Sequence, residues 1–292
     1  MQGTGRRLIG QKMKPYLMMA PMLVLALLFA YYPFATTLLQ AFSYVDVRQR
    51  IVGFAGLENF RYLFSRSDFS AALSNTLLLT VMNVPLTLVL TAFLAALADK
   101  KRALSPVYEV LFSLPMAVAM STAALIFKVM FNPSVGIINQ ALGIQCKWYE
   151  GRDTALYGIL MLTIWMGIGY NYCLFLAAFR GVSPDLLQAA QLDGANSLQQ
   201  LWYIKLPAAA PTAVYAACTN TVLCMMCSGP VLIMIKDSLK RRVSTLIYMM
   251  YASGYQSSDY GTAACVALVT FALTALFSLL ILRFEKQRGE AA

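Results

Sequence analysis

Long apolar runs separated by short polar segments dominate this chain of 292 residues. A helix needs about 20 apolar residues to cross the hydrocarbon layer of a bilayer. Six runs reach that length, at residues 17–40, 73–98, 107–131, 155–179, 207–235 and 262–282. The pattern predicts an all-α integral membrane bundle of six transmembrane helices, with little chain left over for a soluble domain.

Composition supports a membrane protein. Hydrophobic residues make up 59% of the chain, charged residues only 12%, and the mean hydropathy is +0.63. Such a composition cannot form one soluble core beneath a polar surface. The 23 Lys and Arg residues exceed the 13 Asp and Glu, but they are scattered between the apolar runs. We therefore expect membrane lipid, and no nucleic acid, as the partner of these cations.

The N-terminal segment favours a cytoplasmic start. Residues 1–16 carry Arg6, Arg7, Lys12 and Lys14 without an acid, and no small-residue cleavage site follows a short apolar stretch. We expect a retained span rather than a signal peptide. The expected domains are a basic tail at 1–16, a transmembrane domain at 17–282 and a tail at 283–292.

Orientation is not decided by counting basic residues. Twelve fall on the side of the two termini and eleven on the other side. Short flanking segments count most in the positive-inside rule, and the N-terminal tail is wholly basic. Both termini are therefore expected in the cytoplasm.

The chain lacks the common signatures of enzymes. There is no GxSxG, no HExxH, no glycine-rich dinucleotide fingerprint and no GxxxxGK[ST] phosphate loop. Cys224 and Cys227 have the spacing of a metal pair, but the chain has no histidine and no second CxxC, so apolar packing is favoured. We expect no enzymatic activity, no metal and no cofactor in this chain, so any ATP chemistry belongs to a separate polypeptide.

Ion coupling is also weakly supported. No ionisable residue lies near the middle of a predicted span, and only Glu109 and Lys128 fall close to the ends of the third. Proton-coupled carriers usually keep such groups inside the membrane. The absence of such groups does not exclude sodium sites formed by backbone carbonyls, so a secondary carrier or channel remains an alternative. A membrane scaffold or sensor without a transport pathway is another.

A polar, glycine-interrupted hairpin, residues 183–207, separates the fourth and fifth runs. Ser183-Pro184 is typical of a helix start, and Gly194 can end that helix in a left-handed turn. Ser197 and Gln200 have the spacing of a capping box for a second short helix. Spacing alone leaves an ordinary amphipathic hairpin at the membrane surface equally open.

The hairpin resembles the EAA loop of ABC import permeases. The matching positions are Ala189, Ala190, Asp193, Gly194, Ala195, Ile204, Leu206 and Pro207. Gln188 replaces the leading Glu, and Leu201 stands where many members carry Phe. The resemblance implies that this loop docks on an ATPase. The replacement at Gln188 predicts docking by shape and apolar contact, with less help from charge.

The resemblance covers about residues 15–285 and is to the sugar-type permeases related to the maltose and glycerol-phosphate importers. Its further elements are Gly56-Leu57-Glu58-Asn59-Phe60, Asn75-Thr76, Leu114-Pro115, Phe131-Asn132-Pro133, Gly136-Ile137-Ile138-Asn139 and Gly229-Pro230. It implies the type I importer permease fold in a bacterial plasma membrane. It also implies a second permease in a heterodimer, two ABC ATPase subunits that bind ATP and Mg, an extracellular solute-binding protein and a carbohydrate substrate.

The fourth run mixes glycine, aromatic and amide groups, which suit a sugar: aromatic faces stack on it and amides bond its hydroxyls. In the maltose-type permeases that the chain resembles, this helix and the next line the sugar site. The resemblance therefore implies this substrate pathway: Thr163, Trp165, Gly167, Tyr170, Asn171, Asn220, Leu223, Cys224 and Cys227. Close helix packing is the competing explanation. Weaker candidates are Asn83, Ser121 and Thr122. The basic run at 236–242 leaves open an anionic solute such as a glycerol phosphate, an acidic binding protein or a lipid anchor.

Overall fold

The computed structural model describes residues 16–100, 103–151, 153–240 and 242–289. Most of the basic N-terminal tail, including its four cations, and the last three residues lie outside these ranges. Within them, five helices are long and apolar enough to cross a membrane: Tyr16–Ala41, Ser67–Ala98, Ala155–Arg180, Ala210–Met234 and Tyr260–Arg283. These helices confirm five of the six expected spans, with bounds that differ by a few residues.

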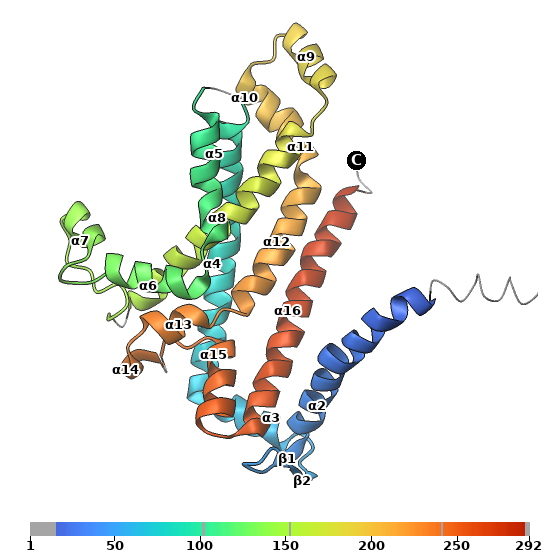
Figure 1. Ribbon diagram of the computed structural model, residues 1–292, viewed down its shortest axis with the longest axis vertical. Coiled ribbons are helices and arrows are strands. Elements are labelled where there is room, and N and C mark those ends of the chain that lie inside the picture. The colour runs from blue at the N-terminus through green and yellow to red at the C-terminus, as the bar shows by residue number, and fades with distance from the viewer. Residues whose placement is uncertain (1–15, 101–102, 152, 241, 290–292) are drawn as a thin grey trace, which may run out of the picture.

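Four long helices stand side by side and form the bundle (Figure 1). They are α4 (Ser67–Ala98), α8 (Ala155–Arg180), α12 (Ala210–Met225) and α16 (Tyr260–Gly289). The short helices α9 (Pro184–Leu192) and α10 (Ser197–Gln200) project from one end, called here the hairpin end. Strands β1 (Ser43–Val45) and β2 (Ile51–Phe54) mark the opposite, strand end.

The shorter elements connect or cap these helices. They are α2 (Tyr32–Ala41), α3 (Glu58–Ser65), α5 (Ser105–Ser113), α6 (Met120–Met130), α7 (Ile137–Leu142), α11 (Leu206–Ala208), α13 (Gly229–Met234), α14 (Asp237–Lys240) and α15 (Leu246–Tyr251). Short π-helical turns η1 (Leu27–Tyr31), η3 (Leu201–Lys205) and η4 (Ala252–Gln256) interrupt the helical ladder, and η2 (Leu114–Ala117) is a 3-10 turn.

The third apolar run departs from the prediction of one continuous span. Ser105–Ala117 and Met120–Met130 are bent by 107° at a short break, so the run is a broken span or a re-entrant loop rather than one continuous helix. Pro115 lacks a backbone N–H, and the two residues after η2 are extended rather than helical. Figure 1 shows α5 descending beside α8 and α6 turning away to the side. Counted as one span, this pair makes the total six.

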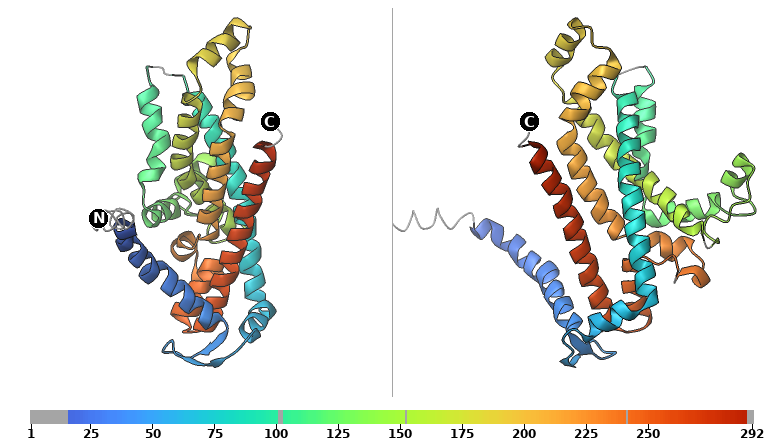
Figure 2. Two further views of the ribbon diagram at one scale, coloured as in Figure 1. Left: turned by 90° about the vertical axis from the view of Figure 1, so that its right-hand side faces the viewer. Right: turned by 180° about the vertical axis from the view of Figure 1, so that it is seen from behind.

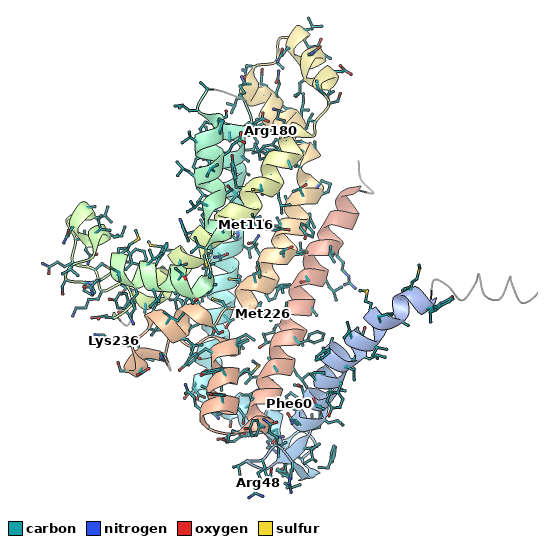
Figure 3. The ribbon with its side chains drawn as sticks, in the orientation of Figure 1. Arg48, Phe60, Met116, Arg180, Met226 and Lys236 are labelled. Carbon is teal, nitrogen blue, oxygen red and sulfur yellow. The ribbon has the colours of Figure 1, made fainter. Side chains whose placement is uncertain are left out.

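A glycine on α8 makes room for this break. A Cβ on Gly169 would lie 2.5 Å from the backbone nitrogen of Met116 and 2.9 Å from the carbonyl oxygen of Ser113. Figure 3 marks Met116 where η2 meets α8. In a membrane, non-helical backbone is tolerated only where protein covers it. The break is therefore placed where α8 can shield it.

The N-terminal helix Tyr16–Ala41 leans away from the bundle (Figures 1 and 2). None of its most apolar 18-residue window is buried. Near the strand end, the ring of Phe34 packs on Phe271 of α16, with centroids 5.3 Å apart. The rest of this helix leaves a large apolar surface without a partner in the described chain.

Asparagines of the resemblance motifs hold the loops. The side-chain amide of Asn59 donates to the carbonyl oxygens of Ala41 and Ser43, at 3.0 and 2.9 Å, and so closes the end of α2. The amide of Asn139 donates to the carbonyl oxygen of Cys146 at 2.9 Å, while its oxygen accepts from the indole of Trp148 at 2.7 Å. These motifs thus have a structural explanation.

Replacing Gly169 with alanine is expected to destabilise the protein by about 2 kcal/mol, because the new methyl group overlaps the backbone of η2. The midpoint of thermal unfolding in detergent measures the change. Gly53→Ala is the control, since its Cβ would meet only the ring of Tyr44 at an ordinary 3.7 Å. An unaltered midpoint for Gly169→Ala would contradict the close packing of η2 on α8.

Candidate functional site

A cavity of ≈ 380 Å³ lies between α4, α8 and α12, beside the first residue of α6. It is lined by Asn83, Met120, Thr163, Met166, Gly167, Tyr170, Asn171, Thr219, Asn220, Leu223, Cys224 and Cys227. No side chain in this lining is a carboxylate, an ammonium or a guanidinium. The cavity therefore offers hydroxyl, amide, aromatic and thiol groups without a fixed charge.

Eight of the nine residues predicted to form a substrate pathway line this cavity, and so does the weaker candidate Asn83. Trp165 does not. Two residues beyond Thr163, it is turned about 200° around the helix and packs on Phe127, with ring centroids 5.4 Å apart. Ser121 and Thr122 on α6 are exposed outside the cavity lining.

Three lining residues were missed by sequence reasoning: Met120, Met166 and Thr219. Thr219 lies four residues before Leu223 on the same helical face, and this spacing was an available signal. Met166 lies three residues after Thr163 and four before Tyr170, so it too shares the lining face. Met120 carried no signal, because the bend between η2 and α6 brings it to the cavity.

Two asparagines that line the cavity donate their side-chain amide hydrogens to other groups of the protein. Asn171 donates to the side-chain oxygen of Asn220 at 3.1 Å, and Asn220 donates back to that of Asn171 at 2.8 Å. Their remaining donor hydrogens go to the carbonyl oxygens of Gly167 and Ala216, both at 2.7 Å. Since each amide has only two donor hydrogens, this pair joins α8 to α12 and forms a rigid wall.

Asn83 makes a similar contact from α4. Its amide donates to the hydroxyl of Thr163 at 2.9 Å, and its oxygen accepts from the hydroxyl of Thr87 at 3.3 Å. A Cβ on Gly167 would lie 2.8 Å from the Thr87 methyl carbon. Gly167 therefore permits close packing of α4 on α8, and it also lies in the cavity lining.

Tyr170 is the group best placed to contact a ligand. Its hydroxyl lies 3.2 Å from that of Tyr215 on α12, and its side chain is only partly buried. The Thr219 hydroxyl, one turn along from Tyr215, donates to the Tyr215 carbonyl oxygen at 2.9 Å and can still accept. A half-open aromatic face beside neutral hydroxyls is suited to a polyhydroxylated solute.

The hairpin begins as the sequence predicts. The Ser183 hydroxyl caps α9 by accepting from the backbone N–H of Asp185 at 3.3 Å, and Pro184 is the first helical residue. Gly194 follows α9 with a φ of +86°, a left-handed conformation that favours glycine. The helix start and the glycine turn are therefore both confirmed.

The predicted capping box is wrong by one residue. Asn196, rather than Ser197, is the N-cap of α10, and its side-chain oxygen accepts from the backbone N–H of Leu198 and Gln199. The side-chain oxygen of Gln199 in turn accepts a hydrogen bond from the Asn196 backbone N–H at 2.7 Å. Gln200 instead points back to the Ala195 carbonyl oxygen at 3.3 Å. Asn196 has the extended backbone of an N-cap and its side chain can cap as well as that of serine, so the helix starts one residue earlier.

The residues assigned to ATPase docking divide into an exposed tip and a partly buried base. Gln188, Ala189, Asp193, Gly194 and Pro207 are exposed, whereas Ala190, Ala195, Leu201 and Ile204 are partly buried. Leu201 packs against the buried cluster that contains Tyr172 and Phe179 of α8. The tip is thus free to meet another protein while the base stays joined to the bundle.

Three polar contacts connect the hairpin end of the bundle. Lys205 forms an ion pair with Asp99, which follows α4, and the two side chains are only 13% and 12% exposed. The Lys100 ammonium donates to the hydroxyl of Ser197 at 2.7 Å. Arg180, marked in Figure 3, bonds Glu109 of α5 at 2.6 Å and the Ala98 carbonyl oxygen at 3.0 Å. The first two contacts join the hairpin to the end of α4, and the third joins α8 to α4 and α5.

The basic run at 236–242 is partly neutralised at the other side of the molecule. Lys236, which Figure 3 places near α14, pairs with Glu150 at 2.8 Å. Lys240 pairs with Asp237 at 2.6 Å, and its hydrogen bond holds the pKa of that carboxyl below its usual value. These pairs reduce the field that this run presents to a solute.

Comparison with known families identifies the class of protein. Residues 88–289 match the model of the binding-protein-dependent transport system inner membrane component. The chain belongs to this family. It is therefore the permease subunit of an ABC importer, a transport protein with several membrane spans in an inner membrane.

Curated relatives extend the similarity over nearly the whole permease. The sn-glycerol-3-phosphate transport system permease protein of Pectobacterium atrosepticum is 27% identical over 278 residues, 94% of each chain. The protein of the same name from Salmonella typhi is 28% identical over 289 residues, 98% of each chain. The permease thus corresponds to these relatives along their full length.

Solved structures confirm the fold. A chain of a bacterial alginate ABC transporter, crystallised with an alginate pentasaccharide-bound periplasmic protein, superposes with a TM-score of 0.83 over 94% of each chain at 20% identity. A second structure of a bacterial ABC transporter that imports the acidic polysaccharide alginate gives 0.84 at 19% identity. The permease therefore has the type I importer fold that its sequence motifs implied.

Replacing Asp99 with asparagine is expected to lower the thermal stability of the permease by about 2 kcal/mol, because Lys205 loses its partner in a largely buried setting. The swap Asp99→Lys with Lys205→Asp is expected to regain most of the loss. Asp237→Asn is the matched control: its carboxylate also pairs with a lysine but is 94% exposed, and we expect no measurable effect. Equal shifts for both asparagine variants would contradict a structural role for the Asp99–Lys205 pair.

Proposed function

We propose that the chain forms half of the translocation pathway for a carbohydrate and that the solute passes through the cavity between α4, α8 and α12. The neutral lining supports this proposal, since Tyr170 and Thr219 offer an aromatic face and a hydroxyl while the amide pair holds the wall. The walls come from three helices that a rocking motion can rearrange. Alternating access would then open the cavity to each side in turn.

The hairpin end faces the cytoplasm in this proposal, with both termini on that side, and the hairpin docks on one of two ATPase subunits that hold ATP and Mg. Exposed apolar side chains support a docking role: Leu192 is 90%, Tyr203 80%, Leu198 63% and Trp202 61% exposed. Gln188 is exposed and neutral. Apolar contact and shape therefore supply the attachment, and a binding protein delivers solute at the strand end.

A second permease completes the pathway. The N-terminal helix supports this partner, because none of its most apolar window is buried within the chain. Tyr170 in the cavity lining is also only partly buried within the chain, and a second subunit would cover it. A heterodimer with a similar permease satisfies both surfaces.

An anionic sugar derivative is the second candidate substrate. Its support is that the relatives are named for sn-glycerol-3-phosphate and for the acidic polysaccharide alginate. The cavity lining of this chain holds no cationic side chain. If the solute is acidic, its charge must be balanced by the partner permease while this chain reads its hydroxyl groups.

Tyr170→Ala is expected to raise the KM for uptake about five-fold in the reconstituted importer, because a stacked ring contributes roughly 1 kcal/mol to binding. Tyr170→Phe should keep most of the affinity, since the ring remains. Tyr157→Ala, on the same helix but outside the cavity lining, is the control. Uptake kinetics measured with a neutral and an acidic sugar separate the two candidates. If Tyr170→Ala and Tyr157→Ala behave alike, Tyr170 is not in the pathway.

Gly194→Val is expected to lower transport per ATP hydrolysed about ten-fold, because a β-branched residue at a φ of +86° strains the hairpin by ~1–2 kcal/mol. ATP hydrolysis itself should persist. Gly143→Val is the matched control, since Gly143 also has a positive φ, of 63°, and open space around it, but follows α7 far from the hairpin. Coupled transport that survives in Gly194→Val would remove the docking role.

A further inference from the structure

A second pocket, of ≈ 470 Å³, lies at the hairpin end, apart from the cavity between α4, α8 and α12. The end of α4, one face of α5, α10 and the turn η3 enclose it. Its lining includes Lys100, Lys205, Asp99, Tyr108 and Ser197 as polar groups. The transport mechanism proposed above assigns no ligand to this pocket.

The charge of the pocket favours an anion. Lys205 and Asp99 neutralise each other in their ion pair, so Lys100 supplies the surplus positive charge among the lining residues. Its ammonium uses one of three protons on the hydroxyl of Ser197, at 2.7 Å, and two remain free. Ser197 accepts that bond, so its own proton is also free to donate. An ammonium and a hydroxyl side by side make a two-point site for a phosphate oxygen.

The remaining lining is apolar, and the pocket lies at the level where spans end. Leu97, Phe112 and Leu201 contribute to its walls, and Leu97 is 55% exposed. Asp99 directly follows the span Ser67–Ala98, and Lys205 lies five residues before the span Ala210–Met234. The outer face of α5 beside the pocket is also apolar, with Val107 58% exposed. An occupant must therefore combine an anionic head with a hydrocarbon part.

We propose that this pocket binds the headgroup of an anionic phospholipid, with its phosphate on Lys100 and Ser197 and its acyl region along Leu97. Lys100 follows α4, whereas Ser197 begins α10 of the hairpin. The bound phosphate bridges the two and strengthens the connection between the hairpin and α4. Anionic lipid thereby raises coupling. The effect on coupling rests on the proposed function, but binding of the lipid does not.

The test measures lipid retention on the complete importer by native mass spectrometry, without solute or ATP. Complex purified from bilayers of phosphatidylcholine and phosphatidylglycerol should retain phosphatidylglycerol, and Lys100→Gln should reduce that retention about five-fold. Ser197→Ala should reduce it less, and Lys100→Arg should preserve it. Arg283→Gln is the matched control, because Arg283 ends a span near the same face but is not part of the pocket. Equal retention by Lys100→Gln and wild type overturns the proposal.

A second measurement separates lipid from a free anion. Solute-stimulated ATPase activity in nanodiscs should rise when phosphatidylglycerol is added to phosphatidylcholine. Lys100→Gln should lose this increment, measured for each variant as the ratio of its activities with and without phosphatidylglycerol. Inorganic phosphate added to phosphatidylcholine discs should have no effect. If inorganic phosphate reproduces the increment, the pocket is a site for a soluble anion and the lipid proposal is wrong. If the wild-type complex retains phosphatidylglycerol but transports no carbohydrate, the lipid site stands and the proposed function is wrong.

Discussion

Close packing of α8 against its neighbours is the contact on which the rest of the structure depends. Within hydrocarbon every backbone polar group needs a partner in the protein, so irregular backbone must be covered. Gly169 lets the third apolar run lie against α8. Gly167 lets Thr87 of α4 come into contact with α8. Both glycines are on the helix that also presents Tyr170 to the cavity. The cavity is thus a consequence of how α8 is packed.

The two ends of the bundle are joined to this centre by different means. At the strand end, asparagine side chains bond loop carbonyls, as Asn59 does for the end of α2. At the hairpin end, the Asp99–Lys205 pair and the Lys100–Ser197 bond connect the hairpin to α4. Since α4 also carries Asn83 into the cavity wall, one rigid helix links the hairpin to the pathway. In the proposed function, this continuity would give movement of the hairpin a physical route to the cavity.

Local signals predicted much of this arrangement. Apolar run length located five spans, and the Ser183 cap and Gly194 turn located the hairpin. Helical periodicity placed Thr163, Gly167 and Tyr170 on one face, and they do line one cavity. The errors share one origin. Hydropathy cannot distinguish a straight helix from the 107° bend after Pro115, and spacing cannot tell which of Asn196 and Ser197 will adopt the extended cap conformation.

By itself, the sequence determined the membrane class, the positions of the spans, the hairpin and the family motifs, because apolar length and turn chemistry are properties of neighbouring residues. Only the tertiary structure decided which polar groups are free. Asn171 and Asn220, 49 residues apart in sequence, each give one amide hydrogen to the other and the second to a backbone carbonyl, so neither has a donor left for a ligand. Lys205 pairs with Asp99 across 106 residues, which leaves Lys100 as the surplus cation among the described residues that line the second pocket. A hydrogen bond or ion pair is decided by the distance between atoms, and folding sets that distance.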